Sequence, residues 1–161
     1  MNHNSILPQI LSKDQKILHL TLDTQKLEDS DTFEEYKIGG PSTEHDLVLD
    51  FNDKDFALNI PKGHYDTIVL TTILEQIEDP VNLITNLKYL SEYLVIWEFK
   101  YDALDQIDPS WKQPWKTIGL TWNFSQHFDL INELFLQEAT LLTCKLPYTP
   151  KEEKENVNAI R

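Results

Sequence analysis

The sequence predicts an α/β domain, a mostly parallel sheet with helices on its faces. The run Thr67–Thr72 is almost continuously apolar or β-branched, as expected of a strand that is covered on both faces. Asp79-Pro80 then marks a helix start, with a capping aspartate and a proline at the first helical position. A further run of strand length follows at Tyr93–Phe99. Strand, helix and strand within about 35 residues form a crossover unit, which favours parallel pairing.

Shorter patterns predict the remaining elements. Apolar runs of strand length occur at Lys16–Leu20, at Asp46–Phe51 and, as the last strand, at Ala139–Leu146. A short helix or arm is expected over Ile6–Leu11. Five apolar residues at helical spacing supply the buried face of the helix that Pro80 starts: Val81, Leu83, Ile84, Leu87 and Leu90.

A second amphipathic helix is predicted near the end of the chain. Phe124, Phe128, Ile131 and Phe135 recur at i, i+4, i+7 and i+11, with Asn123 or Ser125 as the cap. By contrast, the acidic stretch from Thr21 to Glu35 has little periodicity. Gly39-Gly40-Pro41 is the strongest break in the chain and predicts a turn.

Composition indicates one globular domain over residues 1–150 with a polar tail over 151–161. The net charge is −13, from 27 acidic and 14 basic residues, which argues against a phosphate-binding surface and hence against nucleic acid. No apolar run approaches the length of a membrane span, and the first residues do not resemble a signal peptide. The single cysteine, Cys144, is typical of a reducing compartment, so we expect an acidic cytoplasmic protein with this thiol in its core.

Between Asp46 and Phe99 the chain resembles the class I S-adenosylmethionine-dependent methyltransferases. In that family an acidic residue ends the third strand, a Phe-Asp or Tyr-Asp pair precedes a buried fourth strand, and Leu-Glu-His and Asp-Pro lead into a helix. The corresponding residues are Asp50-Phe51, Tyr65-Asp66, Thr67–Thr72, Leu74-Glu75-Gln76 and Asp79-Pro80, with Gln76 in place of the family's histidine. The resemblance implies a reduced, Rossmann-like fold that closes with an antiparallel C-terminal strand.

The resemblance also implies S-adenosylmethionine as the cofactor, at the carboxyl ends of the strands. The residues expected there are Leu20, Thr21, Asp50, Phe51, Thr71 and Thr72. The family has an acidic residue followed by Gly-x-Gly after its first strand, because only glycine lets the backbone approach the cofactor closely. No glycine occurs here from Thr21 to Ile38, and the segment is short, so at least one helix of this half is expected to be missing or replaced by a loop.

Two short segments, one rich in glycine and one acidic, each have two possible interpretations. Gly39-Gly40-Pro41 is either a turn or a displaced glycine loop, and the turn is favoured because no helical pattern follows it. Glu34 and Glu35 are either a solvated acidic edge, which is favoured, or the family's ribose-binding acid.

Two functions from different classes follow. The favoured one is a non-catalytic binding or scaffold module that pairs with itself or with an active methyltransferase. The alternative is an active S-adenosylmethionine-dependent methyltransferase of a small molecule or protein. Segment 109–124, with Trp111, Trp115 and Trp122, could line an acceptor pocket or cover, plug the cofactor site, form a partner interface or pack in the core.

No catalytic residue can be assigned from the sequence. The five histidines lack metal-ligand spacing, so no metal is expected. His64 is read as a loop residue rather than a general base. Ser125, His127 and Asp129 alternate on one predicted helix, where side chains two residues apart face away from each other.

Overall fold

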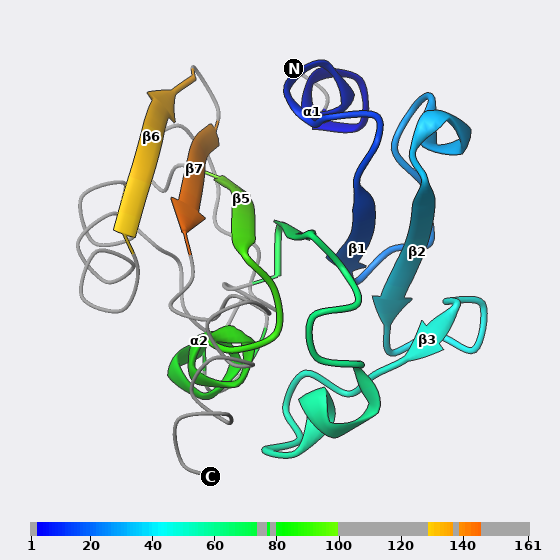
Figure 1. Ribbon diagram of the computed structural model, residues 1–161. Coiled ribbons are helices and arrows are strands. Elements are labelled where there is room, and N and C mark those ends of the chain that lie inside the picture. The colour runs from blue at the N-terminus through cyan, green and yellow to red at the C-terminus, as the bar shows by residue number, and fades with distance from the viewer. Residues whose placement is uncertain (1–2, 74–76, 78–79, 100–128, 137–138, 146–161) are drawn as a thin grey trace, which may run out of the picture.

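The computed structural model describes residues 3–73, 77, 80–99, 129–136 and 139–145. A seven-stranded sheet in the order β3-β2-β1-β4-β5-β7-β6 forms the middle layer (Figure 1). The pairs from β3 to β5 are parallel, whereas β7 is antiparallel to both of its neighbours. The elements are α1 (His3–Ile10), β1 (Lys16–Thr21), η1 (Ser30–Thr32), β2 (Glu35–Gly40), β3 (Leu47–Val48), η2 (Phe56–Asn59), β4 (Thr67–Thr71), α2 (Pro80–Leu87), β5 (Tyr93–Phe99), β6 (Asp129–Phe135) and β7 (Ala139–Lys145).

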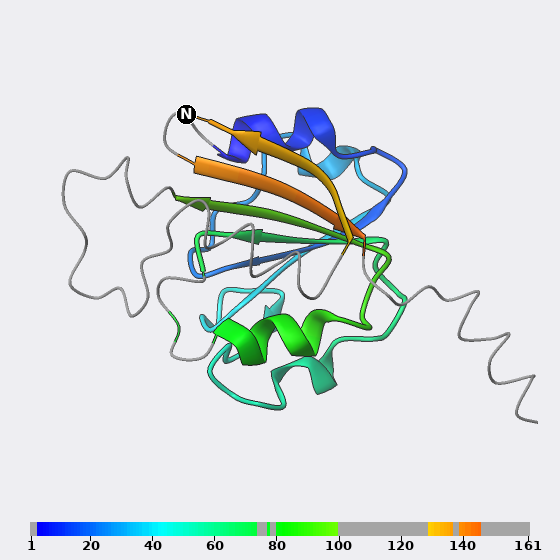
Figure 2. The same ribbon diagram turned by 90° about the vertical axis from the view of Figure 1, so that its left-hand side faces the viewer.

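The sheet separates two apolar cores, because successive side chains of a strand point to opposite faces. One core lies under α2 and η2, and the other lies under α1 and the segment between β1 and β2 (Figure 2). On β4, Leu70 faces the first core and Val69 the second, and both are fully buried. Leu7 anchors α1 in the second core, and the ring of His3 lies 6.0 Å from that of Trp97.

These observations confirm the predicted α/β architecture with an antiparallel strand pair near the C-terminus. The predictions of β1, β4, α2, β5 and β7 are confirmed, and so is a short N-terminal helix. On α2, the side chains of Leu83 and Leu87 are buried as expected, as is Leu90 beyond its end. Segment 109–124 and the tail 151–161 lie outside the described residues.

The predicted helix over Phe124–Phe135 is wrong in its second half. Asp129–Phe135 is strand β6, which pairs antiparallel with β7, while Phe124 and Phe128 lie outside the described residues. The register shifts between Leu130 and Asn132, so Ile131 is an extra residue in the strand. Such a bulge breaks the period-two alternation of a strand, and the apolar residues then fall at a spacing that resembles a helix.

The region of Gly39 and Gly40 also differs from the prediction. These glycines are the last residues of β2, and the bends follow at Pro41. The strand was missed because Glu35–Gly40 has little apolar character. Downstream, the strand predicted over Asp46–Phe51 is reduced to two residues in β3.

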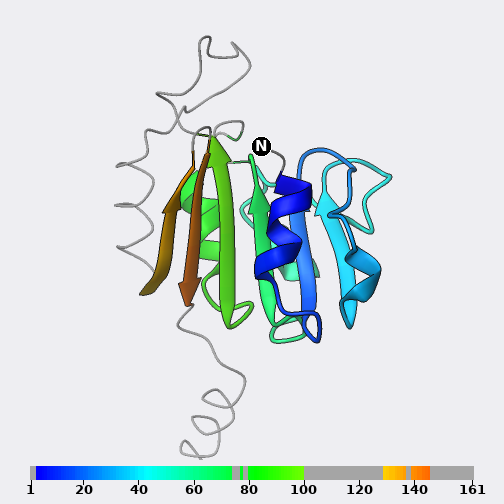
Figure 3. The ribbon, with the colours of Figure 1, turned by 90° about the horizontal axis from the view of Figure 1, so that it is seen from above.

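The expected loss of a helix in this half of the chain is confirmed. The segment 22–34, which is described throughout, contains the short η1 turn and no α-helix. Leu27 and Phe33 from this segment are buried in the core under α1. The helix that precedes β1 therefore supplies the cover of this sheet face, as seen from above in Figure 3.

Candidate functional site

The carboxyl ends of β1 and β4 meet where the sheet order reverses. From β1 the chain proceeds outward to β2 and β3, whereas from β4 it proceeds to β5 on the other side. In open α/β sheets, ligands bind in the crevice outside such a switch point. Thr21 and Thr71 are paired in register there, so they mark the place of a candidate site.

Four of the six residues expected to contact a cofactor are enclosed by protein. Leu20, Thr21 and Thr71 are fully buried, and Phe51 is 2% exposed. The Leu20 side chain belongs to the core under α2, where Phe51 also packs edge-on against Phe56. These side chains are therefore part of the packed interior.

The other two residues retain contact with solvent. Asp50 is exposed, and its carboxylate accepts the amide of Asn52 in a local turn at 3.0 Å. Thr72 is half-buried and has a φ of 53°, in the left-handed region that a β-branched residue rarely adopts. The structure thus brings Leu20, Thr21, Thr71 and Thr72 together at the ends of the two central strands. Asp50 and Phe51 follow β3 in the chain, and the Phe51 side chain packs in the same core as Leu20.

A buried hydrogen-bond chain crosses the sheet just below the switch point. His19 Nε2 lies 2.8 Å from Thr71 Oγ1, and His19 Nδ1 lies 2.6 Å from the Tyr36 hydroxyl. That hydroxyl accepts the amide of Leu27 at 3.0 Å, so its own hydrogen is free to be donated to Nδ1. The Nε2–H then donates to Thr71, which assigns a neutral imidazole.

The electrostatics agree with a neutral ring. Burial lowers the pKa of His19 to about 3, and the charges of His3 and His45 act in the same direction. Burial also raises the pKa of Tyr36. His19 therefore serves as a structural bridge and is a poor proton acceptor at neutral pH.

A second histidine lies at the carboxyl ends of β1 and β2 and joins the loops that follow these two strands. His45 Nε2 donates to the carbonyl of Asp23 at 2.7 Å, and its Nδ1 accepts the amide of Ser42 at 3.0 Å. A Cβ on Gly40 would overlap both this ring and the carbonyl oxygen of Thr21. Gly40 is thus required by the close approach of the ring, which is only 4% exposed.

Sequence reasoning did not single out His19 or His45. The signal for His19 was a lone polar residue inside the apolar run Lys16–Leu20, which suggests a buried and satisfied side chain. The signal for His45 was weaker, since only its position shortly after two glycines set it apart.

The residues that follow β4 are hydrogen-bonded to β5. The amide of Thr72 donates to the carbonyl of Trp97 at 2.9 Å, and the amide of Ile73 donates to Glu98 Oε1 at 3.0 Å. Glu98 is fully buried. These two bonds hold the backbone in the strained conformation at Thr72.

Glu35 lies at the opposite end of the sheet from the candidate site. It begins β2, and its carboxylate pairs with His64 Nε2 at 2.7 Å. Burial, followed by the nearby carboxylate of Glu35, raises the pKa of Tyr65 to about 12. Since Glu34 is exposed at the same end, neither glutamate meets the carboxyl ends of the strands.

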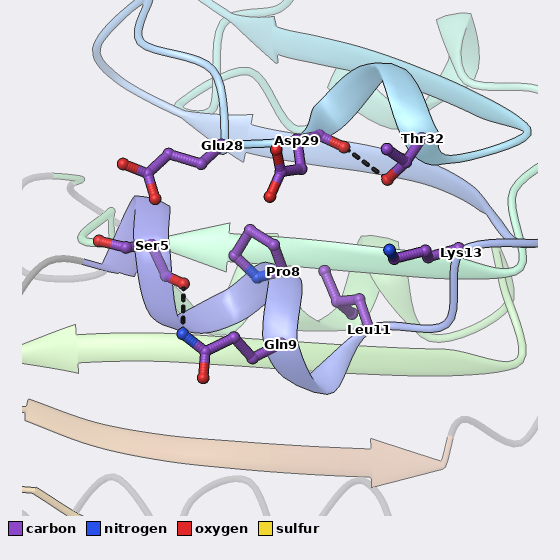
Figure 4. Close-up of a pocket in the computed structure, with 8 residues that line it drawn as sticks. All are labelled: Ser5, Pro8, Gln9, Leu11, Lys13, Glu28, Asp29 and Thr32. Carbon is purple, nitrogen blue, oxygen red and sulfur yellow. Dashed lines mark hydrogen bonds between the residues drawn. The ribbon is translucent and has the colours of Figure 1, made fainter.

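A surface cavity of about 360 Å³ lies beside α1 (Figure 4). Its walls come from α1 and the residues after it on one side, and from the segment around η1 on the other: Ser5, Pro8, Gln9, Leu11, Lys13, Glu28, Asp29 and Thr32. One lysine and two acidic residues at its rim do not define a ligand class.

The described part of the chain offers no cluster of three or more histidine, cysteine or acidic residues that could hold a metal ion. Within the same residues, no helix is long and apolar enough to cross a membrane. Cys144 is fully buried in the core under α2, as predicted.

Comparison with known proteins shows similarity in structure and not in sequence. No family model matches the chain, and no curated protein matches it. A SAM-dependent methyltransferase from Aquifex aeolicus superposes with a TM-score of 0.65 at 14% identity, covering 88% of this chain and 87% of that one. A putative type 11 methyltransferase from Sulfolobus solfataricus gives 0.62 at 12% identity, covering 90% and 92%. The methyltransferase CalH, in complex with SAH, gives 0.60 at 13% identity, covering 83% of this chain and 52% of that one.

Proposed function

Because the chain has the fold of the class I S-adenosylmethionine-dependent methyltransferases, we propose that it is a non-catalytic relative that uses this fold as a binding or scaffold module. The main support for this proposal is that the carboxyl end of β1 is covered by protein. Thr21 is fully buried, and no glycine follows it until Gly39. A large cofactor needs an accessible backbone at this point, which glycine provides and a buried threonine does not.

The second support is the filling of the strand ends by protein groups. His19 occupies both of its ring nitrogens with Tyr36 and Thr71, and His45 bonds across the β1 exit. A ligand would have to displace these hydrogen bonds, and each buried group left without a partner costs about 1–3 kcal/mol.

The proposed scaffold would use the outer strand β6 to contact a partner. Within the described residues, β6 is the last strand of the sheet, and its Ile131 and Leu134 are 55% and 45% exposed. A strand edge with exposed apolar side chains is a template for pairing with another chain. A second copy and an active methyltransferase are the two partners that this proposal includes.

The alternative is an active methyltransferase with an atypical cofactor loop. The observation in its favour is that Asp50 and Thr72 remain accessible near the strand ends. Positioning of two substrates in line would suffice for methyl transfer to an acceptor that is already nucleophilic. In that case the acceptor would be a small molecule or protein.

Calorimetric titration of S-adenosylmethionine distinguishes the two functions. The non-catalytic proposal expects no binding at millimolar cofactor. Micromolar binding that is lost in Asp50→Ala would overturn it and establish the alternative. Asp53→Ala is the matched control, because Asp53 is also exposed and also accepts an amide within the same loop.

A further inference from the structure

Two side chains fasten the segment between β2 and β3: Asp46 Oδ2 accepts the amide of Ile38 in β2 at 2.9 Å, and His45 bonds to the loop after β1. Pro41, Thr43, Glu44 and Asp46 are exposed, whereas His45 is 4% exposed. The His45 ring is the buried side chain of this segment, and its bond to the carbonyl of Asp23 ties the segment to the loop after β1. We refer to residues 41–46 as the strap.

Both nitrogens of the inserted His45 ring are hydrogen-bonded to backbone groups. Its Nε2–H donates to the carbonyl of Asp23, which belongs to the loop after β1 and is 22 residues away in sequence. Its other nitrogen accepts an amide of the strap itself, from Ser42. Both edges of the heterocycle are therefore satisfied by backbone groups, and the 2.7 Å bond to Asp23 is the contact that joins two loops.

The space around the ring is shaped for it. The absence of a side chain at Gly40 leaves room for the ring against the backbone of β2. The site has a glycine floor, a carbonyl acceptor and a position at the carboxyl ends of two parallel strands. Such positions are where open α/β sheets place ligands.

We propose that His45 is a latch: its ring is the built-in occupant of a heteroaromatic site between the exits of β1 and β2, and it holds this edge of the sheet closed. Withdrawal of the ring would free the carbonyl of Asp23 and uncover Gly40. The vacated site takes a flat heteroaromatic ring with an N–H donor. This inference concerns the same end of β1 as the proposed function but does not depend on it.

Substitutions at His45 separate the bond between the loops from the bond within the strap. In His45→Gln, the terminal amide nitrogen stands near the position of Nε2 and keeps a donor for Asp23. In His45→Asn, the shorter amide can still accept from Ser42 but does not reach Asp23. His45→Ala removes both bonds and the ring.

Hydrogen exchange of the peptide spanning Leu20–Leu27 reports on the latch. We expect exchange there to rise by about tenfold or more in His45→Ala and His45→Asn, and by less than about threefold in His45→Gln. Equal exchange in His45→Gln and His45→Asn would contradict the latch, because the bond to Asp23 would then have no special role. This pair of variants also decides the matter if His45→Ala does not fold.

Free imidazole tests whether the site is built for a heteroaromatic ring. His45→Ala should lower the Tm by roughly 5–10 °C, and imidazole should recover at least about half of that loss. 1-Methylimidazole lacks the N–H and should recover much less. His64→Ala is the control, because the His64 side chain is 38% exposed and imidazole has no cavity to fill there.

An unchanged Tm in His45→Ala would overturn the latch. So would a lowered Tm that imidazole raises no more than it raises that of the wild type. These results are independent of the cofactor titration: binding of S-adenosylmethionine by the wild type would sink the proposed function, whatever imidazole does to His45→Ala.

Discussion

His19 and Thr71 join the two central strands of the sheet through a buried hydrogen bond of 2.8 Å between Nε2 and Oγ1. Both side chains are fully buried on the face that α1 covers, next to the point where the sheet order reverses. This polar bridge thus lies in the interior, beside the point outside which open α/β sheets bind ligands. The bridge requires a neutral imidazole, and this requirement has measurable consequences.

The stability of the domain should fall as the pH is lowered, because of His19. Burial lowers the pKa of this ring from 6.5 to about 3 in the folded state, while the unfolded chain keeps the ordinary value. Between these values the unfolded state binds the additional proton. We therefore expect the free energy of unfolding to fall as the pH drops below 6.5, by about 1.4 kcal/mol per pH unit from this group, and to be level with respect to it above 6.5.

Urea unfolding at pH 7, 6 and 5 measures this slope. His19→Gln keeps polar atoms toward Tyr36 and Thr71 but does not titrate, so its unfolding free energy should vary less with pH. The pKa of His3 is also lowered by burial, so some slope of the same sign remains in the variant. Equal slopes in the two proteins would mean that His19 is not held neutral by the fold.

Tyr36→Phe should break the same hydrogen-bond chain at its other end. The hydroxyl accepts the amide of Leu27 and lies 2.6 Å from His19 Nδ1, so its removal leaves a buried donor and a buried acceptor unpaired. We expect a loss of about 1–3 kcal/mol in the free energy of unfolding. A double-mutant cycle with His19→Gln should give a coupling of about 0.5 kcal/mol or more. Simple additivity of the two losses would contradict a shared network.

The strands with continuous apolar runs could be predicted from the sequence, because burial on both faces leaves a direct record in composition. Thr67–Thr72 and Tyr93–Phe99 are such runs, and both form strands of the central sheet. The strand Glu35–Gly40 has no such record, because its place depends on pairing with β1 and β3. Tertiary pairing thus overrides weak local preference there.

The sequence predicted where the candidate site lies but not which side chains fill it. The rule for parallel sheets correctly brings Thr21 and Thr71 together. It does not reveal that the strand ends are filled by histidines, because His19 and His45 meet their partners across 17 to 52 residues of sequence. Missing glycines indicate that a cofactor loop is absent, but they do not indicate what takes its place.

Gly40→Ala should destabilise the domain more than Gly39→Ala does. A Cβ at position 40 would overlap the backbone carbonyl of Thr21, which cannot move without disturbing β1, and the ring of His45. A Cβ at position 39 would lie 3.0 Å from side-chain methyl carbons of Leu20 and Leu49, which can adjust. We expect a loss of about 2–3 kcal/mol for Gly40→Ala and less than about 1 kcal/mol for Gly39→Ala.

Thermal unfolding of the two glycine variants checks this order. The comparison controls for the intrinsic effect of replacing glycine by alanine in a strand, since both residues belong to the end of β2. A smaller loss in Gly40→Ala than in Gly39→Ala would contradict the close contact of Gly40 with the His45 ring and the Thr21 carbonyl.

The helix α1 should be an integral part of the folded domain and not an appended arm. Leu7 is fully buried in the core that also contains Val69 and Trp97, whereas Ile10 on the same helix is 50% exposed. We expect Leu7→Ala to lower the free energy of unfolding by about 2–5 kcal/mol, because it leaves a cavity in a packed core, and Ile10→Ala to cost less than about 1 kcal/mol. Urea unfolding of both variants measures the difference. Both variants introduce alanine into the same helix, so Ile10→Ala serves as the control for Leu7→Ala. If Leu7→Ala unfolded at the same urea concentration as the wild type, α1 would not be the cover that compensates for the α-helix absent from segment 22–34.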